Sequence, residues 1–277
     1  MSSSAVQKSL VVFGGNGFLG RRICQQGIQK GYKITSMSRS GAPPKNILPS
    51  DNQWVEKVNW KKVNIFDPET YADELATSNI VVHSLGILLE GRNYKETLNS
   101  FPGSKNSSVF CKNGVSSISP YPNPMDKSIY NSYDYMNRQS ALIACREFLE
   151  KTDPFSKRTF VYISADQNFV GIPHGYLDSK RKAESEILQM KQNFENFQPI
   201  LMRPSFMFDE TISNDFRVIL KDGLSLLNYV NKNLLNDTLS SFVRPPVSTQ
   251  KVARCIFDKI EEEKFDGPVL LEEILKH

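Results

Sequence analysis

The sequence predicts an α/β protein of the Rossmann type, in which a doubly wound parallel sheet carries a small helical C-terminal lobe. The first observation is the apolar run 10–13 (Leu-Val-Val-Phe), typical of a strand buried on both faces of a parallel sheet. The second is the cluster of glycines that follows at once, with a helical pattern opening at Phe18. The third is the length, because 277 residues suit one large α/β domain with a small appended lobe.

The glycines form the pattern G-x-G-x-x-G between a strand and a helix, which is the context expected of a dinucleotide-binding turn. One glycine allows the tight turn after the strand, another lets the backbone approach a pyrophosphate, and a third lets the helix pack closely on the strand. The N-terminus of that helix adds free N–H groups and the positive end of a dipole. A nucleotide site is therefore favoured over a glycine-rich turn that binds nothing.

The composition argues against several other classes of protein. The cysteines are scattered without a C-x-x-C pair, and the three histidines are scattered as well, so neither disulfides nor a metal site are expected. A net charge of +4 is too mild to indicate nucleic-acid binding. No run of about 18 apolar residues occurs, so the sequence predicts no membrane-spanning helix.

Positive charge is concentrated at the start of the chain, where no acidic residue precedes Asp51. An acid-poor N-terminus is a feature of mitochondrial targeting segments. The first strand begins by residue 10, however, which leaves no room for a separate cleavable presequence in front of it. A basic rim around an anionic cofactor is the favoured explanation, and targeting stays undecided on this pattern alone.

The second expected strand, 33–37, ends in Ser-Met-Ser-Arg-Ser at positions 36–40. A site that prefers NAD(H) would carry an acid there, about 20 residues beyond the glycines, to hold the ribose 2′-hydroxyl. Arg39 stands in this region instead, and a guanidinium can pair bidentately with a 2′-phosphate. The sequence thus predicts NADP(H) rather than NAD(H), with an ordinary surface arginine as the alternative.

Two further strands are expected at 62–65 and 79–83, after a loop over 41–60. Asp67 follows the first of them and could either contact the adenine or cap the next helix. His83 ends the second, and we interpret it as a satisfied strand-end histidine rather than a catalytic base. Small residues follow at 84–86, where a cofactor could pass closely.

The rest of the chain is predicted to alternate helices and strands, apart from one segment without a recognisable pattern. Residues 91–131 show no periodicity and read as a long insertion. The expected division is a Rossmann domain over 1–205 and a C-terminal lobe over 206–277, of which 248–277 returns to the sheet. Helices are expected over 133–149, around 176–180 and on to about 194, over much of the apolar stretch 216–235, and from a Ser248 or Thr249 cap to 263. Strands are expected over 159–164, 199–203 and 268–271.

A second group of candidate residues follows the strand 159–164. Tyr176 and Lys180 are four residues apart, so they share one face of a helix. A phenol has an ordinary pKa of about 10 and needs a nearby ammonium to act as an acid–base catalyst at neutral pH. Ser164, at the strand end, can hydrogen-bond a carbonyl oxygen as charge develops on it.

The glycine turn, Ser164 and the Tyr176-x-x-x-Lys180 pair together resemble the short-chain dehydrogenase/reductases, in their extended or atypical branch. The stretches 81–90, 162–166, 203–210 and 271–276 look like the fungal mitochondrial group tied to coenzyme Q biosynthesis, which is similar to the NADPH-binding accessory subunit of respiratory complex I. The resemblance covers nearly the whole chain apart from 91–131. It implies a Rossmann fold, bound NADP(H), a location on the matrix side of the mitochondrial inner membrane, and association with the coenzyme Q biosynthetic complex.

The resemblance also assigns roles to individual residues. Tyr176 and Lys180 align with the active-site pair, and Ser164 lies at or next to the Ser/Thr position. The chain departs from the usual pattern of two small hydroxyl residues, since it has Ser-Ala-Asp at 164–166. The cofactor-binding positions implied are Gly14, Asn16, Gly17, Phe18, Leu19, Gly20, Arg39, Asp67, Leu85, Gly86, Lys180 and Pro204.

Two functional hypotheses follow. In the first, the protein is an NADP(H)-dependent carbonyl or hydroxyl oxidoreductase of quinone biosynthesis, in which Tyr176 exchanges a proton with the substrate oxygen. In the second, it is a structural or regulatory subunit whose bound NADPH stabilises the fold; a sensor of the NADPH/NADP ratio is a weaker variant. The apolar stretch 216–235 is expected to pack as a substrate lobe, with a cleft or patch for a quinone, a prenylated ring, a partner or a membrane surface as the alternative.

Overall fold

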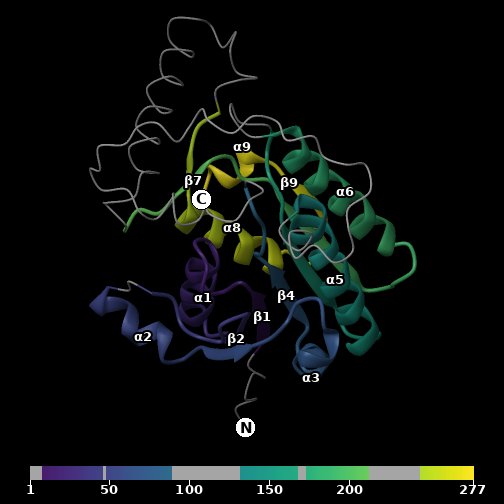
Figure 1. Cartoon of the computed structure of the whole chain (residues 1–277), viewed down its shortest axis with the longest axis horizontal. Helices are drawn as coiled ribbons and strands as arrows, with labels where there is room; N and C mark the ends of the chain where they lie inside the picture. The colour runs from purple at the N-terminus through teal and green to yellow at the C-terminus, as the bar shows by residue number, and fades with distance from the viewer. Residues whose placement is uncertain (1–7, 46–47, 89–131, 168–172, 212–243) are drawn as a thin grey trace, which may run out of the picture.

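The computed structural model describes residues 8–45, 48–88, 132–167, 173–211 and 244–277 (Figure 1). Within these residues, one parallel sheet of seven strands runs in the order β3-β2-β1-β4-β5-β6-β9. The Rossmann-type fold class predicted from the sequence is confirmed. The strands are β1 Ser9–Phe13, β2 Lys33–Ser38, β3 Asn59–Lys62, β4 Ile80–His83, β5 Arg158–Ile163, β6 Phe197–Met202 and β9 Gly267–Val269, and a second sheet pairs β7 Met207–Phe208 with β8 Val247–Ser248.

Helices cover both faces of the large sheet (Figure 1). The alternation of side chains along β1 sends Leu10 and Val12 to the face of α1 and α8, and Val11 and Phe13 to the face of α3, α5 and α6. Each side forms its own apolar core. The helices are α1 Gly20–Gln29, α2 Asn52–Val55, α3 Ala72–Ala76, α5 Ser140–Lys151, α6 His174–Met190, α8 Thr249–Glu261 and α9 Leu271–Ile274, with short 3₁₀ turns at Pro49–Asp51 and Pro68–Thr70.

The strand order reverses between β1 and β4, which lie side by side but are separated in sequence by β2 and β3. Ligands of open α/β sheets bind outside the carboxyl ends of the strands at this point. The glycine turn follows β1 and residues 84–86 follow β4, so the fold brings both predicted cofactor segments to the same place. Figure 1 shows β1 and β4 next to each other, beside α1.

Two helix boundaries carry capping residues. Gly31 adopts a φ of +82°, the left-handed conformation that ends α1 after its C-cap Lys30. At α8 the cap is Ser248 rather than Thr249, because the side chain of Ser248 accepts a hydrogen bond from the N–H of Lys251 at 3.2 Å.

The predicted bounds of the third strand were wrong. The strand was expected over 62–65 but β3 covers Asn59–Lys62, and Val63 and Ile65 contribute to the core from the loop beyond it. As an edge strand β3 needs few apolar residues, so the apolar positions did not mark it. The expected loop over 41–60 also contains α2, in which Trp54 is buried and donates through Nε1 to Asp51 at 2.9 Å.

The helix expected over 133–149 is present but begins unusually. Residues Asp134–Gln139 form a π-helical turn that continues into α5. The insertion 91–131 and the apolar stretch 216–235 lie outside the described residues, so the expectations placed on them stay predictions.

Candidate functional site

The glycine turn after β1 is held in a closed conformation. Gly14 has a φ of +84°, and its N–H donates to the carbonyl of Met37 at 2.8 Å, which ties the turn to β2. The N–H of Gly17 donates to the carbonyl of Gly14 at 2.9 Å. A Cβ at Gly20 would lie 2.0 Å from the same carbonyl oxygen, so α1 can start this close to β1 only with glycine there.

The start of α1 suits an anion. Its first turn carries no acidic side chain, and its macrodipole directs positive charge toward the turn. Asn16 reaches from the turn to the loop after β2, donating to Ser40 Oγ at 3.0 Å and to the carbonyl of Ala42 at 3.1 Å. Phe18 is half-buried, whereas the side chain of Leu19 lies in the core, so only its backbone can face a pyrophosphate.

Arg39 directly follows β2 and is exposed. It forms no ion pair with any side chain in the described part of the chain, while Arg21 and Arg22 on α1 both have partners. Its neighbour Ser40 is held by Asn16 from the glycine turn. The predicted reader of the 2′-phosphate therefore lies at the carboxyl end of β2, beside the loop that is tied to the glycine turn.

The remaining predicted cofactor residues lie along the same edge of the sheet. A Cβ on Gly14 would lie 2.8 Å from Leu85 Cδ2, so Leu85 covers the glycine turn from the β4 side. Pro204 follows β6, and its carbonyl accepts from the N–H of Asp166 at 2.9 Å. Asp67 is exposed at the start of a 3₁₀ turn and makes no side-chain cap, which leaves the adenine contact as the prediction for it.

Lys180 is the most strongly perturbed cation of the site. Its side chain comes from α6, and Nζ donates to the carbonyl of Ile163 at 2.7 Å and lies 4.8 Å from the ring centroid of Tyr162. A Cβ on Gly86 would lie 3.2 Å from Nζ, so α6 and the end of β4 meet here. Burial lowers the pKa of Lys180 to about 7, against the weaker opposite effect of Glu184.

Tyr176 lies one helical turn before Lys180 on α6 and is half-buried. Its ring packs edge-on against Tyr133, with centroids 6.0 Å apart, and Tyr133 donates to the carbonyl of Leu88 at 3.1 Å. The structure thus places Tyr176 at the end of β4, as it does Lys180. The roles given to both side chains stay predictions.

Asn137 joins these elements and was not predicted from the sequence. It is fully buried in the π-helical turn; its Oδ1 accepts from the N–H of Ile87 at 2.8 Å, and its Nδ2 donates to the carbonyl of Ile87 and to Ser179 Oγ, both at 3.2 Å. Its own carbonyl accepts from the hydroxyl of Tyr162 at 2.5 Å. A π-helical turn often marks a functional site, but no residue pattern announces it in a single sequence.

His83 ends β4 beneath this cluster. It is fully buried, Nε2 lies 2.9 Å from Ser140 Oγ, and burial lowers its pKa to about 3. Because Ser140 donates to the carbonyl of Met136, His83 is the donor in this contact, and its Nδ1 has no partner among the described residues. The histidine is therefore neutral and only half satisfied, rather than satisfied as expected.

Ser164 follows β5 and is 3% exposed. Its Oγ accepts from Arg181 Nη1 at 3.2 Å, and Arg181 is held in turn by Glu184 at 2.8 Å. Glu184 also pairs with Arg203 through two hydrogen bonds. The predicted hydroxyl is thus at the strand end next to Lys180, but it belongs to a network that the sequence did not reveal.

The buried amine of Lys180 gives stability a specific pH dependence. From pH 7 to the ordinary pKa of 10.5, the unfolded chain binds one proton more than the folded protein, so this group makes the free energy of unfolding rise with pH. Lys180→Met should remove that rise, and the wild-type value should gain about 1 kcal/mol per pH unit over the variant in urea unfolding from pH 7.5 to 9.5. Lys182→Met, at an exposed position of α6, should follow the wild type; equal slopes in wild type and Lys180→Met would contradict the assignment.

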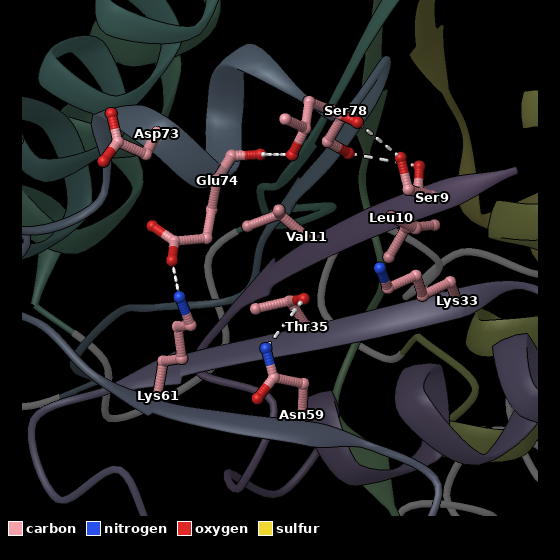
Figure 2. A pocket seen from close by; sticks show the side chains of 11 residues that line it. Ser9, Leu10, Val11, Lys33, Thr35, Asn59, Lys61, Asp73, Glu74 and Ser78 are labelled. Carbon is pink, nitrogen blue, oxygen red and sulfur yellow. Dashed lines mark hydrogen bonds and ion pairs between the residues drawn. The ribbon is translucent and has the colours of Figure 1, made fainter.

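A groove lies at the opposite end of the strands, between α3 and the start of β1 and β2 (Figure 2). It has a volume of about 290 Å³ and polar walls, in which Lys61 forms an ion pair with Glu74 and Thr35 accepts from Asn59. Figure 2 shows these side chains along the sheet face below α3. The groove faces away from the carboxyl ends of the strands, so it is separate from the candidate site.

Within the described residues, no cluster of histidine, cysteine and acidic residues is suited to hold a metal, and no helix is long and apolar enough to cross a membrane. Cys24, Cys145 and Cys255 are free and buried, and burial raises the pKa of each thiol. Cys111 lies outside the described residues.

Sequence comparison identifies relatives. Residues 10–99 match the NAD dependent epimerase/dehydratase family. The chain is 44% identical to MIOREX complex component 2 of Saccharomyces cerevisiae over 280 residues, which cover 96% of this chain and 98% of the yeast protein. An uncharacterized chloroplastic protein of Arabidopsis thaliana is 22% identical over 96% of this chain and 75% of its own length.

Solved structures agree on the fold. The ligand-free aldohexose dehydrogenase of Thermoplasma acidophilum has a TM-score of 0.60 at 13% identity, covering 95% of this chain and 91% of its own. A short-chain dehydrogenase/reductase from Serratia marcescens has a TM-score of 0.60 at 13% identity and covers 96% of both chains. ElxO with NADP bound has a TM-score of 0.54 at 14% identity, covering 98% of this chain and 100% of its own.

Proposed function

The chain belongs to the same family as yeast MIOREX complex component 2, and we propose that it is an NADP(H)-dependent oxidoreductase of the short-chain dehydrogenase/reductase type, in line with the epimerase/dehydratase match of residues 10–99. The observation that carries this proposal is the position of Lys180. Its amine is buried beside Gly86, on the loop after β4, and among the described residues it makes one hydrogen bond, to the carbonyl of Ile163, so within that part of the chain two donors of its ammonium form have no acceptor and can serve a ligand.

The residues present fit a phosphorylated dinucleotide. The glycine turn and the start of α1 would hold the pyrophosphate, Arg39 the 2′-phosphate, and Lys180 the ribose next to the nicotinamide. Bound NADPH would supply the hydride. Leu85 and Gly86, on the loop after β4, would line the nicotinamide side.

Three side chains would take part in the reaction at the substrate oxygen. Tyr176 gives a proton to a carbonyl oxygen, or takes one from a hydroxyl in the reverse direction. Lys180, one turn away, stabilises the phenolate of Tyr176 when the amine is charged, and a lysine with a pKa of about 7 is charged and neutral in similar amounts near neutral pH. Ser164 orients the substrate oxygen.

We further propose that the protein works in mitochondria, on the matrix side of the inner membrane, with the coenzyme Q biosynthetic complex. Two observations support this: the stretches 81–90, 162–166, 203–210 and 271–276 resemble the fungal group tied to coenzyme Q biosynthesis, and the yeast relative is by its name a component of a complex. A quinone or a prenylated ring precursor is the ligand class proposed.

Replacing Tyr176 by phenylalanine should abolish turnover and leave NADPH binding unchanged. The variant loses the acid–base hydroxyl, for which a loss of about 100-fold or more in kcat is expected. NADPH absorbance with quinone-type ring precursors measures turnover, and calorimetry measures binding. Tyr32→Phe, which removes only a hydrogen bond to Glu261 away from the site, should behave as the wild type.

A second candidate function is a structural or regulatory subunit that holds NADPH without reacting. The name of the yeast relative, which describes that protein as a component of a complex, favours it. In that case no precursor is turned over, NADPH raises the melting temperature by mass action, and Tyr176→Phe leaves assembly of the complex intact. Turnover that depends on Tyr176 would exclude this candidate.

A further inference from the structure

Two consecutive residues of α6 bind the last residues of β5 and the loop that follows it. Lys180 donates to the carbonyl of Ile163, and Arg181 donates to the hydroxyl of Ser164. Arg181 also donates through Nη2 to the carbonyl of Ala165 at 2.8 Å and to that of Asp166. The short-chain enzymes that this chain resembles carry two small hydroxyl residues at this strand end, whereas this chain has only Ser164 there. The guanidinium of Arg181 lies where it can hold the hydroxyl of Ser164 in place.

Both terminal nitrogens of the Arg181 guanidinium are engaged by protein. Its four terminal N–H groups have four acceptors: Ser164 Oγ, Glu184 at 2.8 Å, and the carbonyls of residues 165 and 166. Glu184 is 3% exposed and is fixed from β6 by Arg203, at 3.0 and 2.5 Å. Arg181 therefore has no terminal N–H left for a ligand, and its contact with the strand-end hydroxyl is the one to Ser164 Oγ.

The hydroxyl of Ser164 has its donor free. Its oxygen accepts from Arg181, and its hydrogen has no acceptor in the described part of the chain, although the residue is almost wholly buried. A buried donor without an acceptor is costly unless a ligand or water completes it. The nearest carboxylate along the chain, that of Asp166, is engaged by Arg244.

We propose that Arg181 is the positioning residue of the substrate-oxygen subsite. Arg181 donates a hydrogen bond to Ser164 Oγ and so leaves the hydroxyl hydrogen of Ser164 available as a donor. The positive charge of Arg181 makes that donor stronger. The subsite then takes an oxygen that bears or gains negative charge, such as a phenolic oxygen or the carbonyl of a quinone-type ring. This inference rests on the proposed function, because it assumes that the substrate approaches Lys180 and Ser164.

A chromogenic phenol tests the inference without turnover. In the presence of saturating NADP, 4-nitrophenol should bind to the wild type mainly as phenolate, with its own pKa lowered by about one unit, because the hydroxyl of Ser164 donates more strongly to the phenolate than to the neutral phenol. Arg181→Gln and Ser164→Ala should each lose most of this shift, and the double variant should lose no more than either. Arg181→Lys, which keeps the charge but not the four contacts, should keep only part of it.

Controls separate the possible failures. Arg254→Gln, at an exposed position of α8, should keep the full shift, and calorimetry should show wild-type NADPH binding in every variant that remains folded. The inference is overturned if Arg181→Gln or Arg181→Lys shifts the phenol as the wild type does, or if the wild-type NADP complex binds no 4-nitrophenol. Absence of NADPH binding to the wild type would instead overturn the proposed function, and this inference with it.

Discussion

Alanine at position 17 should abolish NADPH binding in a protein that still folds, whereas alanine at position 20 should destabilise the fold itself. A Cβ on Gly17 would meet only the carbonyl oxygen of Gly14, at 3.0 Å, which a shift of a few tenths of an ångström relieves. The same Cβ would stand where the backbone has to approach a pyrophosphate. We expect a loss of at least about 100-fold in affinity, equivalent to about 3 kcal/mol.

Gly20 is constrained by protein rather than by ligand. Its Cβ would lie 2.0 Å from the carbonyl oxygen of Gly14 and 2.8 Å from Cα of Gly15, so backbone would have to move. A loss of about 3 kcal/mol or more in the free energy of unfolding is expected. Thermal unfolding followed by circular dichroism, together with calorimetry, separates the two variants. Normal NADPH binding by Gly17→Ala would show that this turn is not a pyrophosphate site.

Replacement of Arg39 by alanine should lower affinity for NADPH by about 10- to 100-fold and leave affinity for NADH unchanged. A loss of this size is expected when one charge-assisted bidentate contact is removed. Arg39 is exposed and forms no ion pair with the described residues, so its replacement removes no ion pair within that part of the chain. Arg39→Asp should go further and favour NADH, because a carboxylate repels the 2′-phosphate and accepts from the 2′-hydroxyl.

Calorimetric titration of both cofactors into both Arg39 variants measures this change. Arg254→Ala removes an exposed arginine from α8 and should leave both affinities as in the wild type. If Arg39→Ala lowers affinity for the two cofactors equally, the arginine acts on a part of the dinucleotide that both share. Unchanged NADPH affinity would make it an ordinary surface residue.

The sheet and the close packing of the glycine turn could be predicted because local sequence determines them. Strands buried on both faces must be apolar, so β1, β4 and β5 stand out, and the close approach of Gly20 to Gly14 requires glycine. The strand order then follows from the known behaviour of such units. The edge strand β3 could not be recognised in this way, because its four residues are exposed or half-buried and need not be apolar.

The contacts within the site could not be predicted in the same way. Asn137 sits in a π-helical turn that no periodicity reveals, and it is joined to Ile87 across 50 residues of sequence. Arg181 follows Lys180 directly, yet only the packing of α6 on the end of β5 shows that it reaches Ser164. Long-range polar contacts of this kind depend on tertiary placement, which a single sequence does not specify.

The proposed function depends on the turn after β1 binding the pyrophosphate of NADP(H) and on Arg39 binding its 2′-phosphate. Isothermal titration of the folded wild-type protein with NADPH and, separately, with NADH tests it most directly. The account predicts saturable binding of NADPH, at least about 10-fold tighter than that of NADH. No heat of binding with NADPH at millimolar concentration would contradict the whole account, and tighter binding of NADH would contradict the role of Arg39.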